Sequence, residues 1–221
     1  AHELNTPLST MMGYTEFLRT PEEFGGFTDK QKNDFINEVY DNGEALSRII
    51  KDLLDISRIE NGKPIPMILQ EIDFTEVLRK KVETYRTLNP EHTFHLDLPI
   101  NQVQSKFALD RHRINQALEN LLSNAVKYSP EGKDITIAGR EDQEGWEVRI
   151  EDQGIGMNTD QLNRVFDKFY RADASNTATK GLGLGMSIVK QIIEAHGGSI
   201  RIESKEGKGT VVTFNLPYVA D

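Results

Sequence analysis

Hydrophobic residues in the first sixty positions recur at alternating intervals of four and three residues. In the first stretch they are Leu4, Leu8, Met11 and Leu18, with Thr15 filling the gap; in the second they are Phe35, Val39, Leu46, Ile49, Leu53 and Ile56. This spacing predicts two helices with a coiled-coil seam, separated by the helix-breaking stretch 20–27. Thr28 followed by Gln31 predicts a capping box at the start of the second helix.

A hairpin of two helices cannot bury both apolar stripes by itself. We therefore expect a symmetric homodimer, in which two hairpins form a four-helix bundle. Pro7 lacks an N–H and is expected to kink the first helix near its start. Residues 61–66 (NGKPIP) predict the end of the second helix and a linker. These features divide the chain into domains of residues 1–62 and 63–221.

The remainder of the chain alternates between helical and strand patterns. Helices are predicted over residues 74–88, 111–127 and 187–195, and strands over 67–72, 93–98, 103–109 (after a turn at Pro99), 134–140, 146–151, 199–203 and 210–216. Such an order favours a sheet with helices on one face. The predicted fold class is thus α plus α/β, a helical hairpin followed by a two-layer α/β sandwich.

Composition narrows the classes of function. The chain has 221 residues, a net charge of −9 and no cysteine. The negative charge and the lack of a basic stripe exclude a nucleic-acid surface, and the lack of cysteine excludes disulfides and thiolate metal sites. Without a long apolar run or a signal peptide, we expect a soluble, cytoplasmic piece with no membrane contact. Since the helical pattern begins without a cap residue, we also expect an upstream part to be missing, which leaves room for a membrane anchor.

A candidate phosphoryl acceptor lies in the first helical turns. His2 and Thr6 are four residues apart and share one face of a helix, with Glu3 beside them. A carboxylate next to an imidazole can hold it in one tautomer with a nucleophilic nitrogen near neutral pH. The alternative is an ordinary His–Glu pair on a solvated helix face.

A second cluster of polar residues recurs at helical spacing within residues 119–128 (ENLLSNAVKY). Asn120, Asn124, Lys127 and Tyr128 project from one helix face and can line a pocket. Amide oxygens suit a partly hydrated Mg²⁺, and a lysine can meet phosphate. The alternative is a helix end with solvated polar residues.

Two glycine-rich segments flank the remaining candidates. Asp152, Gly154 and Gly156 follow a predicted strand, so that Asp152 can accept from an exocyclic amine, although such a pattern is also typical of a plain turn. Residues 181–185 (GLGLG) precede a helix, whose N-terminus can cradle phosphates. They are neither a Walker loop nor a dinucleotide fingerprint, and a simple helix-entry turn is the alternative.

The segment 165–173 (VFDKFYRAD) lies between these glycines. It carries Lys168 and Arg171, and the small polar residues 174–179 that follow it are expected to form a lid over a nucleotide. Phe166 and Phe169 are interpreted as satellite core residues rather than as ligand contacts.

Five motifs together resemble the conserved boxes of sensor histidine kinases. Residues 2–8 (HELNTPL), 120–128 (NLLSNAVKY), 152–157 (DQGIGM), 165–171 (VFDKFYR) and 181–185 (GLGLG) are similar to the acceptor, N, G1, F and G2 boxes, in that order. The resemblance covers nearly the entire chain. It implies a dimerising hairpin that carries the phosphoacceptor, followed by a Bergerat-type ATP-binding domain like those of gyrase, the mismatch-repair ATPase and the large heat-shock chaperone.

The resemblance also implies a role for each matching residue. His2 would be phosphorylated from ATP, with Glu3 as its orienter or base, and Thr6 would position water for dephosphorylating a partner. Asn120 and Asn124 would hold Mg²⁺ and phosphate, Lys127 and Tyr128 would contact the nucleotide, and Asp152 would accept from the adenine amine. Lys168 would lie at the nucleotide and Arg171 at its γ-phosphate, while Gly154, Gly156, Gly181, Leu182, Gly183, Leu184 and Gly185 would form the binding loops.

Two further expectations follow from the family. The phosphoryl group would pass to an aspartate on a response-regulator receiver domain. Asn5 stands where the family usually has arginine, so any charge contact of that side chain is lost here.

The competing functions are a Bergerat-type ATPase clamp, and a nucleotide-binding scaffold or phosphatase in which His2 is silent. Hydrolytic relatives carry a glutamate base where this chain has Asn120, which disfavours the clamp.

Overall fold

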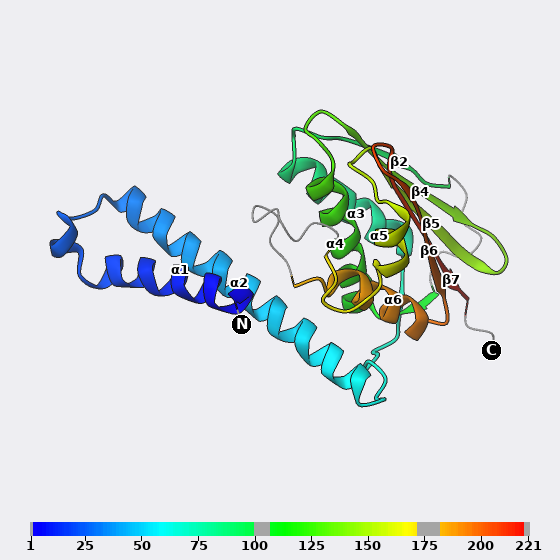
Figure 1. Cartoon of the computed structure of the whole chain (residues 1–221), viewed down its shortest axis with the longest axis horizontal. Helices are drawn as coiled ribbons and strands as arrows, with labels where there is room; N and C mark the ends of the chain where they lie inside the picture. The colour runs from blue at the N-terminus through cyan, green and yellow to red at the C-terminus, as the bar shows by residue number, and fades with distance from the viewer. Residues whose placement is uncertain (1, 100–106, 172–181, 219–221) are drawn as a thin grey trace. The chain divides into compact units, whose positions relative to one another are not determined.

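The structure is a computed structural model that describes residues 2–99, 107–171 and 182–218, with only the backbone of His2, Glu3 and Phe107. The chain forms two compact units, the first mainly of residues 1–61 and the second mainly of residues 62–221. The first is a helical hairpin and the second is an α/β unit, so the predicted fold class is confirmed (Figure 1).

The hairpin consists of α1 (His2–Arg19), the short 3-10 helix η1 (Pro21–Phe24) and α2 (Asp29–Glu60). The break between the helices lies where Pro and Gly predicted it. The capping box is present, because the Thr28 hydroxyl accepts from the Gln31 N–H while the Gln31 side chain accepts from the Thr28 N–H. The assigned helix α1 continues through Pro7 without interruption.

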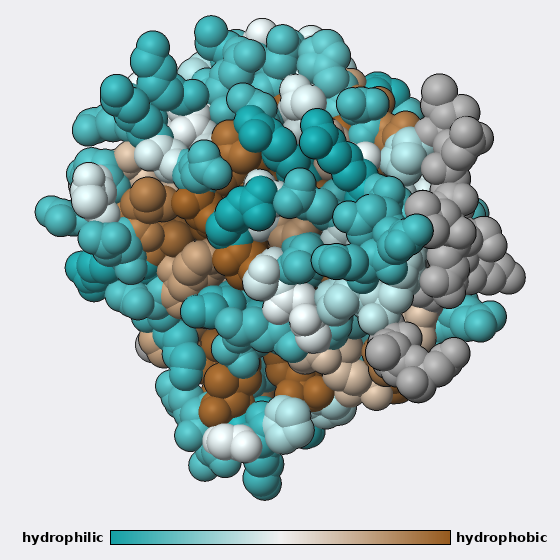
Figure 2. Space-filling view, turned by 90° about the vertical axis from the view of Figure 1, so that its right-hand side faces the viewer, coloured by the Kyte–Doolittle hydropathy of each residue, from teal (hydrophilic) through white to brown (hydrophobic). Residues whose placement is uncertain are grey.

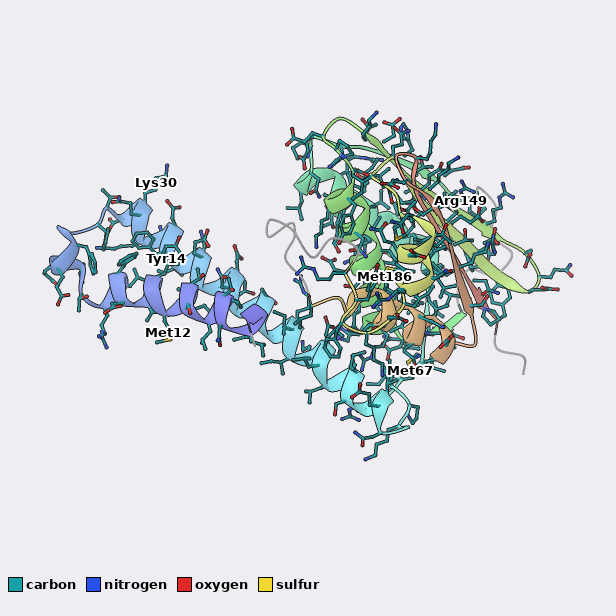
Figure 3. The ribbon with its side chains drawn as sticks, viewed as in Figure 1. Met12, Tyr14, Lys30, Met67, Arg149 and Met186 are labelled. Atoms are coloured by element: carbon teal, nitrogen blue, oxygen red, sulfur yellow. The ribbon has the colours of Figure 1, made fainter. Side chains whose placement is uncertain are left out.

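An aromatic cluster holds the closed end of the hairpin. The Phe17 and Phe24 ring centroids are 4.7 Å apart, those of Phe27 and Phe35 are 5.0 Å apart, and Tyr14 lies 5.3 Å from Phe35. Edge-to-face and tilted aromatic pairs at such distances add to the stability gained from burial alone. The cluster joins both helices to η1, and the label in Figure 3 places Tyr14 on the side of α1 that faces α2.

The first unit also has apolar side chains that α1 and α2 do not cover. On α2 the exposed residues Ile36 and Ile50 are two heptads apart, as are Tyr40 and Leu54. Leu8 and Met12 are exposed on α1, and Thr15 is exposed too. Leu8 and Thr15 of the predicted seam are therefore not covered by the other helix of the same hairpin, because one helix neighbour can cover only one stripe of each helix.

The second unit is built on a five-stranded sheet in the order β2-β4-β5-β7-β6. Its strands are β2 (Thr93–Asp97), β4 (Asp134–Glu141), β5 (Gly145–Asp152), β6 (Ser199–Lys205) and β7 (Gly209–Pro217). β2 pairs in parallel with β4, and the other neighbours pair antiparallel. Helices α3 (Phe74–Leu88), α4 (Arg111–Tyr128) and α6 (Gly185–Ala195) lie on one side of this sheet (Figure 1).

The core fills the space between these two layers. Alternate residues of each central strand face the helices and are buried, and the buried residues of α4 and α6 recur at helical spacing. The main ones are Ile135, Ile137, Trp146, Val148, Ile150, Phe214 and Leu216 from the sheet and Ile114, Leu118, Leu121, Leu122, Ile188, Val189, Ile192 and Ile193 from the helices. A rigid core beneath α4 and α6 fixes the positions of their polar residues.

The opposite face of the sheet is polar. Arg149 lies 2.8 Å from Glu151 on the same strand, and Arg201 lies 3.1 Å from Glu147 on another strand. Figure 2 looks onto the molecule from that side and shows a largely hydrophilic surface with a few brown apolar patches. Among the described residues, no helix combines enough length and hydrophobicity to span a bilayer.

Several elements of the structure differ from the prediction. The first strand is only β1 (Gln70–Ile72), and it pairs with β3 (Phe107–Leu109) in a separate two-stranded sheet. Residues 107–109 therefore pair with β1 and not with the strand at 93–98, and residues 103–106 lie outside the described part. Helix α5 (Thr159–Arg164) was not predicted, since six residues are too few to show an apolar period. Ile65, within the stretch expected to be a linker, is buried.

Candidate functional site

The acceptor residues lie in the first turns of α1. The structure gives the backbone of His2 and Glu3 as helical but not their side chains, so their predicted contact lies outside the described part. Thr6 is half-buried, and its carbonyl accepts from the Thr10 hydroxyl at 3.0 Å. Pro7 has no N–H for the carbonyl four residues earlier, which is that of Glu3.

In the second unit, the polar face of α4 meets the start of α6. The Asn124 amide N–H₂ donates to the Met186 sulfur at 3.3 Å, so that its carbonyl oxygen is left for a ligand. A methyl group added at Gly185 would lie 3.2 Å from the Asn120 amide oxygen. Both amides are thus held against the first two residues of α6, where Figure 3 labels Met186.

The end of α4 meets a second segment, residues 152–157, which we call the Asp152 loop. The Tyr128 carbonyl accepts from the Ile155 N–H at 3.1 Å, and the Lys127 ammonium lies 5.2 Å from the centre of the Tyr128 ring. Gly156 has φ of 65°, and an added side chain there would overlap the Lys205 carbonyl. The sequence 152–157 therefore forms a tight loop between α4 and the β6–β7 hairpin.

Asp152 begins this loop at the end of β5. Its Oδ1 accepts from the Gly154 N–H at 2.8 Å and from the Thr210 N–H at 3.2 Å. Burial raises the pKa of Asp152 above its ordinary value, against the lowering effect of these two hydrogen bonds. A half-buried carboxylate whose one oxygen is fixed by backbone can offer the other to a hydrogen-bond donor of a ligand.

The N-terminus of α6 is suited to anions. Leu184 is the cap residue and makes no side-chain cap bond. The N–H groups of Gly185, Met186 and Ser187 begin the helix and have no carbonyl four residues earlier within it, so they can donate to an anion. The Leu184 side chain itself is buried in the core, which leaves its backbone as the part that can contact a nucleotide. Leu182 is half-buried, and Gly181 lies outside the described residues.

The segment before this glycine turn is packed directly against it. Gly183 has φ of 69°, and an added Cβ would lie 2.6 Å from the Tyr170 carbonyl oxygen. The Arg164 guanidinium lies 4.2 Å from the Tyr170 ring centre, and Lys190 lies 5.4 Å from that of Phe166. Such cation–π contacts can hold residues 165–171 to α5 and α6.

Some expectations for this segment need correction or stay open. Phe169 is 58% exposed and has a positive φ of 62°, so its interpretation as a core residue was wrong; Phe166 is half-buried. Lys168 and Arg171 are half-buried near the end of the described range 107–171. The predicted lid at 174–179 lies outside the described residues.

Sequence reasoning did not find three residues that shape the site. Met186 orients Asn124, while Ser204 and Thr210 hold the Asp152 loop. None carries a local signal, because a methionine in a helix and hydroxyl residues in a hairpin are common everywhere. Apart from this site, the sequence analysis also did not single out the buried His196, whose Nε2 accepts from the Asp110 N–H at 3.0 Å and whose Nδ1 lies 2.8 Å from the Ile192 carbonyl.

The amides of Asn120 and Asn124 fit a magnesium ion that retains most of its water. The part of the chain that the structure describes holds no cluster of three His, Cys, Asp or Glu side chains able to bind a metal. Mg²⁺ is commonly held by few protein oxygens together with water and nucleotide phosphates. The two amide oxygens beside an anion-binding helix end match that arrangement.

Comparison with known proteins agrees with this geometry. Residues 109–220 match the family described as histidine kinase-, DNA gyrase B-, and HSP90-like ATPase, and residues 1–62 match the His Kinase A (phospho-acceptor) domain. The chain is 35% identical to the sensor histidine kinase WalK of Bacillus subtilis, over 99% of this chain and 35% of that protein. It is 33% identical to the sensor protein kinase WalK of Staphylococcus aureus, over 98% of this chain and 52% of that protein. The chain thus spans about a third to a half of these relatives.

A solved structure shares the same architecture over its whole length. The Acinetobacter baumannii histidine kinase AdeS aligns with a TM-score of 0.68 and 26% sequence identity, covering 100% of this chain and 99% of that one.

Proposed function

Because this chain belongs to the family of histidine kinase-, DNA gyrase B- and HSP90-like ATPases and carries a phospho-acceptor domain, we propose that it is a histidine kinase core. It autophosphorylates His2 from ATP and passes the phosphoryl group to an aspartate on a response-regulator receiver domain. Residues 1–62 act as the dimerisation and acceptor domain, and residues 63–221 act as the ATP-binding domain.

One observation carries this proposal most strongly. Three predicted nucleotide motifs that are far apart in sequence meet around α4: Asn120 and Asn124 lie against the start of α6, and Tyr128 bonds the Asp152 loop. We assign the phosphates to the α6 N-terminus and the adenine amine to Asp152, because the first offers N–H donors and the second offers a carboxylate oxygen.

Each residue of the site has a role in the proposed transfer. An unprotonated His2 nitrogen attacks the γ-phosphorus in line, the new N–P bond forms as the bond to the β-phosphate oxygen breaks, and ADP leaves. Glu3 orients the imidazole and takes its proton, and Arg171 stabilises charge on the γ-phosphoryl group. Lys127 and Lys168 contact the nucleotide, and the glycines at 154, 156, 181, 183 and 185 let the backbone approach it.

We assign Mg²⁺ to the Asn120 and Asn124 amide oxygens. When bound, the ion neutralises charge on the nucleotide phosphates. The chain's own contribution is to aim these two oxygens, which it does through the contact between Asn124 and Met186 and through the close approach of Asn120 to Gly185.

We also propose that the hairpin pairs with a second copy of itself. Ile36, Tyr40, Ile50 and Leu54 expose apolar surface at heptad-related positions of α2, and Leu8 and Met12 do so on α1. A second hairpin would bury these side chains in a four-helix bundle. The exposed residues 61–64, at the start of the predicted linker 61–66, would let the ATP-binding domain reach His2. Thr6 would position water when the regulator is dephosphorylated.

The test is incubation of the chain with γ-labelled ATP, followed by acid and base treatment of the labelled protein. The label on the wild-type chain should be lost in acid and retained in base, because a phosphoramidate protonates on nitrogen and expels its phosphoryl group. His2→Gln retains a polar side chain of similar reach but has no basic nitrogen, so its labelling should vanish.

The ATPase clamp predicts that His2→Gln still releases phosphate rapidly. The kinase predicts slow release by this variant, because Asn120 cannot take a proton from water. Rapid magnesium-dependent phosphate release by this variant, with labelling equal to wild type or absent in both proteins, would favour the clamp over the kinase.

A further inference from the structure

Ser204 lies where the β6–β7 hairpin meets the Asp152 loop. Its hydroxyl accepts from the Met157 N–H at 2.9 Å, donates to the Gly209 carbonyl at 2.9 Å and lies 3.0 Å from the Thr210 hydroxyl. A serine hydroxyl has one proton and two acceptor positions. Because its proton goes to Gly209, the Thr210 hydroxyl must be the donor in the third contact, and all three positions are used.

These bonds belong to a larger attachment between loop and hairpin. The Thr210 N–H donates to Asp152 at the start of the loop, and the Gly207 N–H donates to the Ile155 carbonyl in its middle at 2.7 Å. Ser204 holds the end of the loop at Met157. The first two attachments use backbone N–H groups of the hairpin, whereas the third depends on a side chain.

We infer that Ser204 is a positioning residue for nucleotide binding, which acts by holding the Asp152 loop in its binding conformation. The inference rests on the proposed placement of adenine at Asp152. Ser204 itself needs no contact with the nucleotide, because it acts through Met157 and through Thr210, whose backbone fixes the Asp152 carboxylate.

The physical basis is preorganisation. Without the hydroxyl, the half-buried Met157 N–H and the Thr210 hydroxyl each lose a partner, so the observed loop conformation loses stability relative to others. The apparent dissociation constant rises in inverse proportion to the fraction of molecules that keep the binding conformation. The loss should therefore appear in nucleotide affinity and in KM more than in kcat.

The experiment measures ADP binding by calorimetry in the presence of magnesium, on the full chain. Ser204→Ala should raise the dissociation constant by roughly fivefold to 150-fold, the range that corresponds to the loss of a hydrogen-bond partner. Ser204→Thr retains a hydroxyl and should restore most of the affinity. Hydrogen exchange should show faster exchange of the Met157 amide in Ser204→Ala, which reports on the loop directly.

Ser199→Ala is the matched control, since Ser199 lies on the same strand and its hydroxyl also bonds across the hairpin, to Asn215 at 2.8 Å, but at the far end from the loop. It should leave ADP affinity unchanged. Asp152→Asn serves as the second arm. If Asp152→Asn weakens binding and Ser204→Ala does not, the inference about Ser204 is wrong while the proposed site stands. If neither changes affinity, both are overturned.

Discussion

Replacement of Asp152 by asparagine tests the proposed role of one carboxylate in adenine recognition. Oδ1 of Asp152 accepts two backbone hydrogen bonds, from Gly154 at 2.8 Å and from Thr210 at 3.2 Å. An asparagine oxygen can accept both, so the Asp152 loop keeps its internal bonds. What changes is the other atom of the group, which turns from an acceptor into an N–H₂ donor and can no longer accept from the proposed adenine amine.

The magnitude follows from the type of bond that is lost. A hydrogen bond to a charged group contributes about 1.5–3 kcal/mol. Its loss corresponds to a dissociation constant for ADP that rises roughly 10- to 150-fold. Discrimination against guanine nucleotides should shrink in the same variant, because the carboxylate no longer selects an amine donor. Asp152→Ala should be worse, since it also removes the partner of two loop N–H groups.

The assay is calorimetric titration with ADP and GDP in the presence of magnesium, with thermal unfolding to verify the fold. Glu151→Gln is the matched control, since this neighbouring acid lies on the same strand and pairs with Arg149 at 2.8 Å. It should bind ADP as the wild type does. A folded Asp152→Asn protein with wild-type ADP affinity would refute the assignment of adenine to this residue.

Three further predictions follow from the same structure. His2→Gln should abolish labelling while its ADP affinity stays at the wild-type value, and loss of ADP binding in this variant would contradict the separation of acceptor and nucleotide site. Glu3→Ala should still be labelled, but roughly 10²- to 10⁴-fold less, the usual effect of a lost general base. Burial raises the pKa of Asp152, so ADP affinity should fall on acidification at a pH above the ordinary 3.8, and titrations of Asp152→Asn over the same range should lack this step. Burial also lowers the pKa of His196 below its ordinary 6.5. The His196 imidazole therefore binds a proton less well in the folded state than in the unfolded state. The free energy of unfolding should thus be highest above pH 6.5 and should decrease as the pH falls below that value. Thermal unfolding from pH 7.5 down to pH 5.5 should show that decline, and an equal decline in His196→Gln would assign it to other groups.

Local patterns in the sequence were sufficient for the helical hairpin and for the order of elements. The heptad spacing on α2 and the pairing of Thr28 with Gln31 act within one or two turns of chain, so they can be recognised without knowing the rest of the fold. Asn120, Asn124, Lys127 and Tyr128 were likewise placed on one helix face by spacing alone. The five motifs with their order then indicated the family.

Tertiary structure decided what lies next to these motifs. The pairing of β1 with β3, and not with a strand of the main sheet, depends on contacts between residues 35 or more positions apart along the chain. Ser204 and Met186 have their hydrogen-bond partners only because the β6–β7 hairpin lies against the Asp152 loop and α6 lies against α4. Side chains such as these have no periodic signature, because their function comes from a hydrogen-bond partner distant in sequence, and only the folded chain brings that partner within about 3 Å.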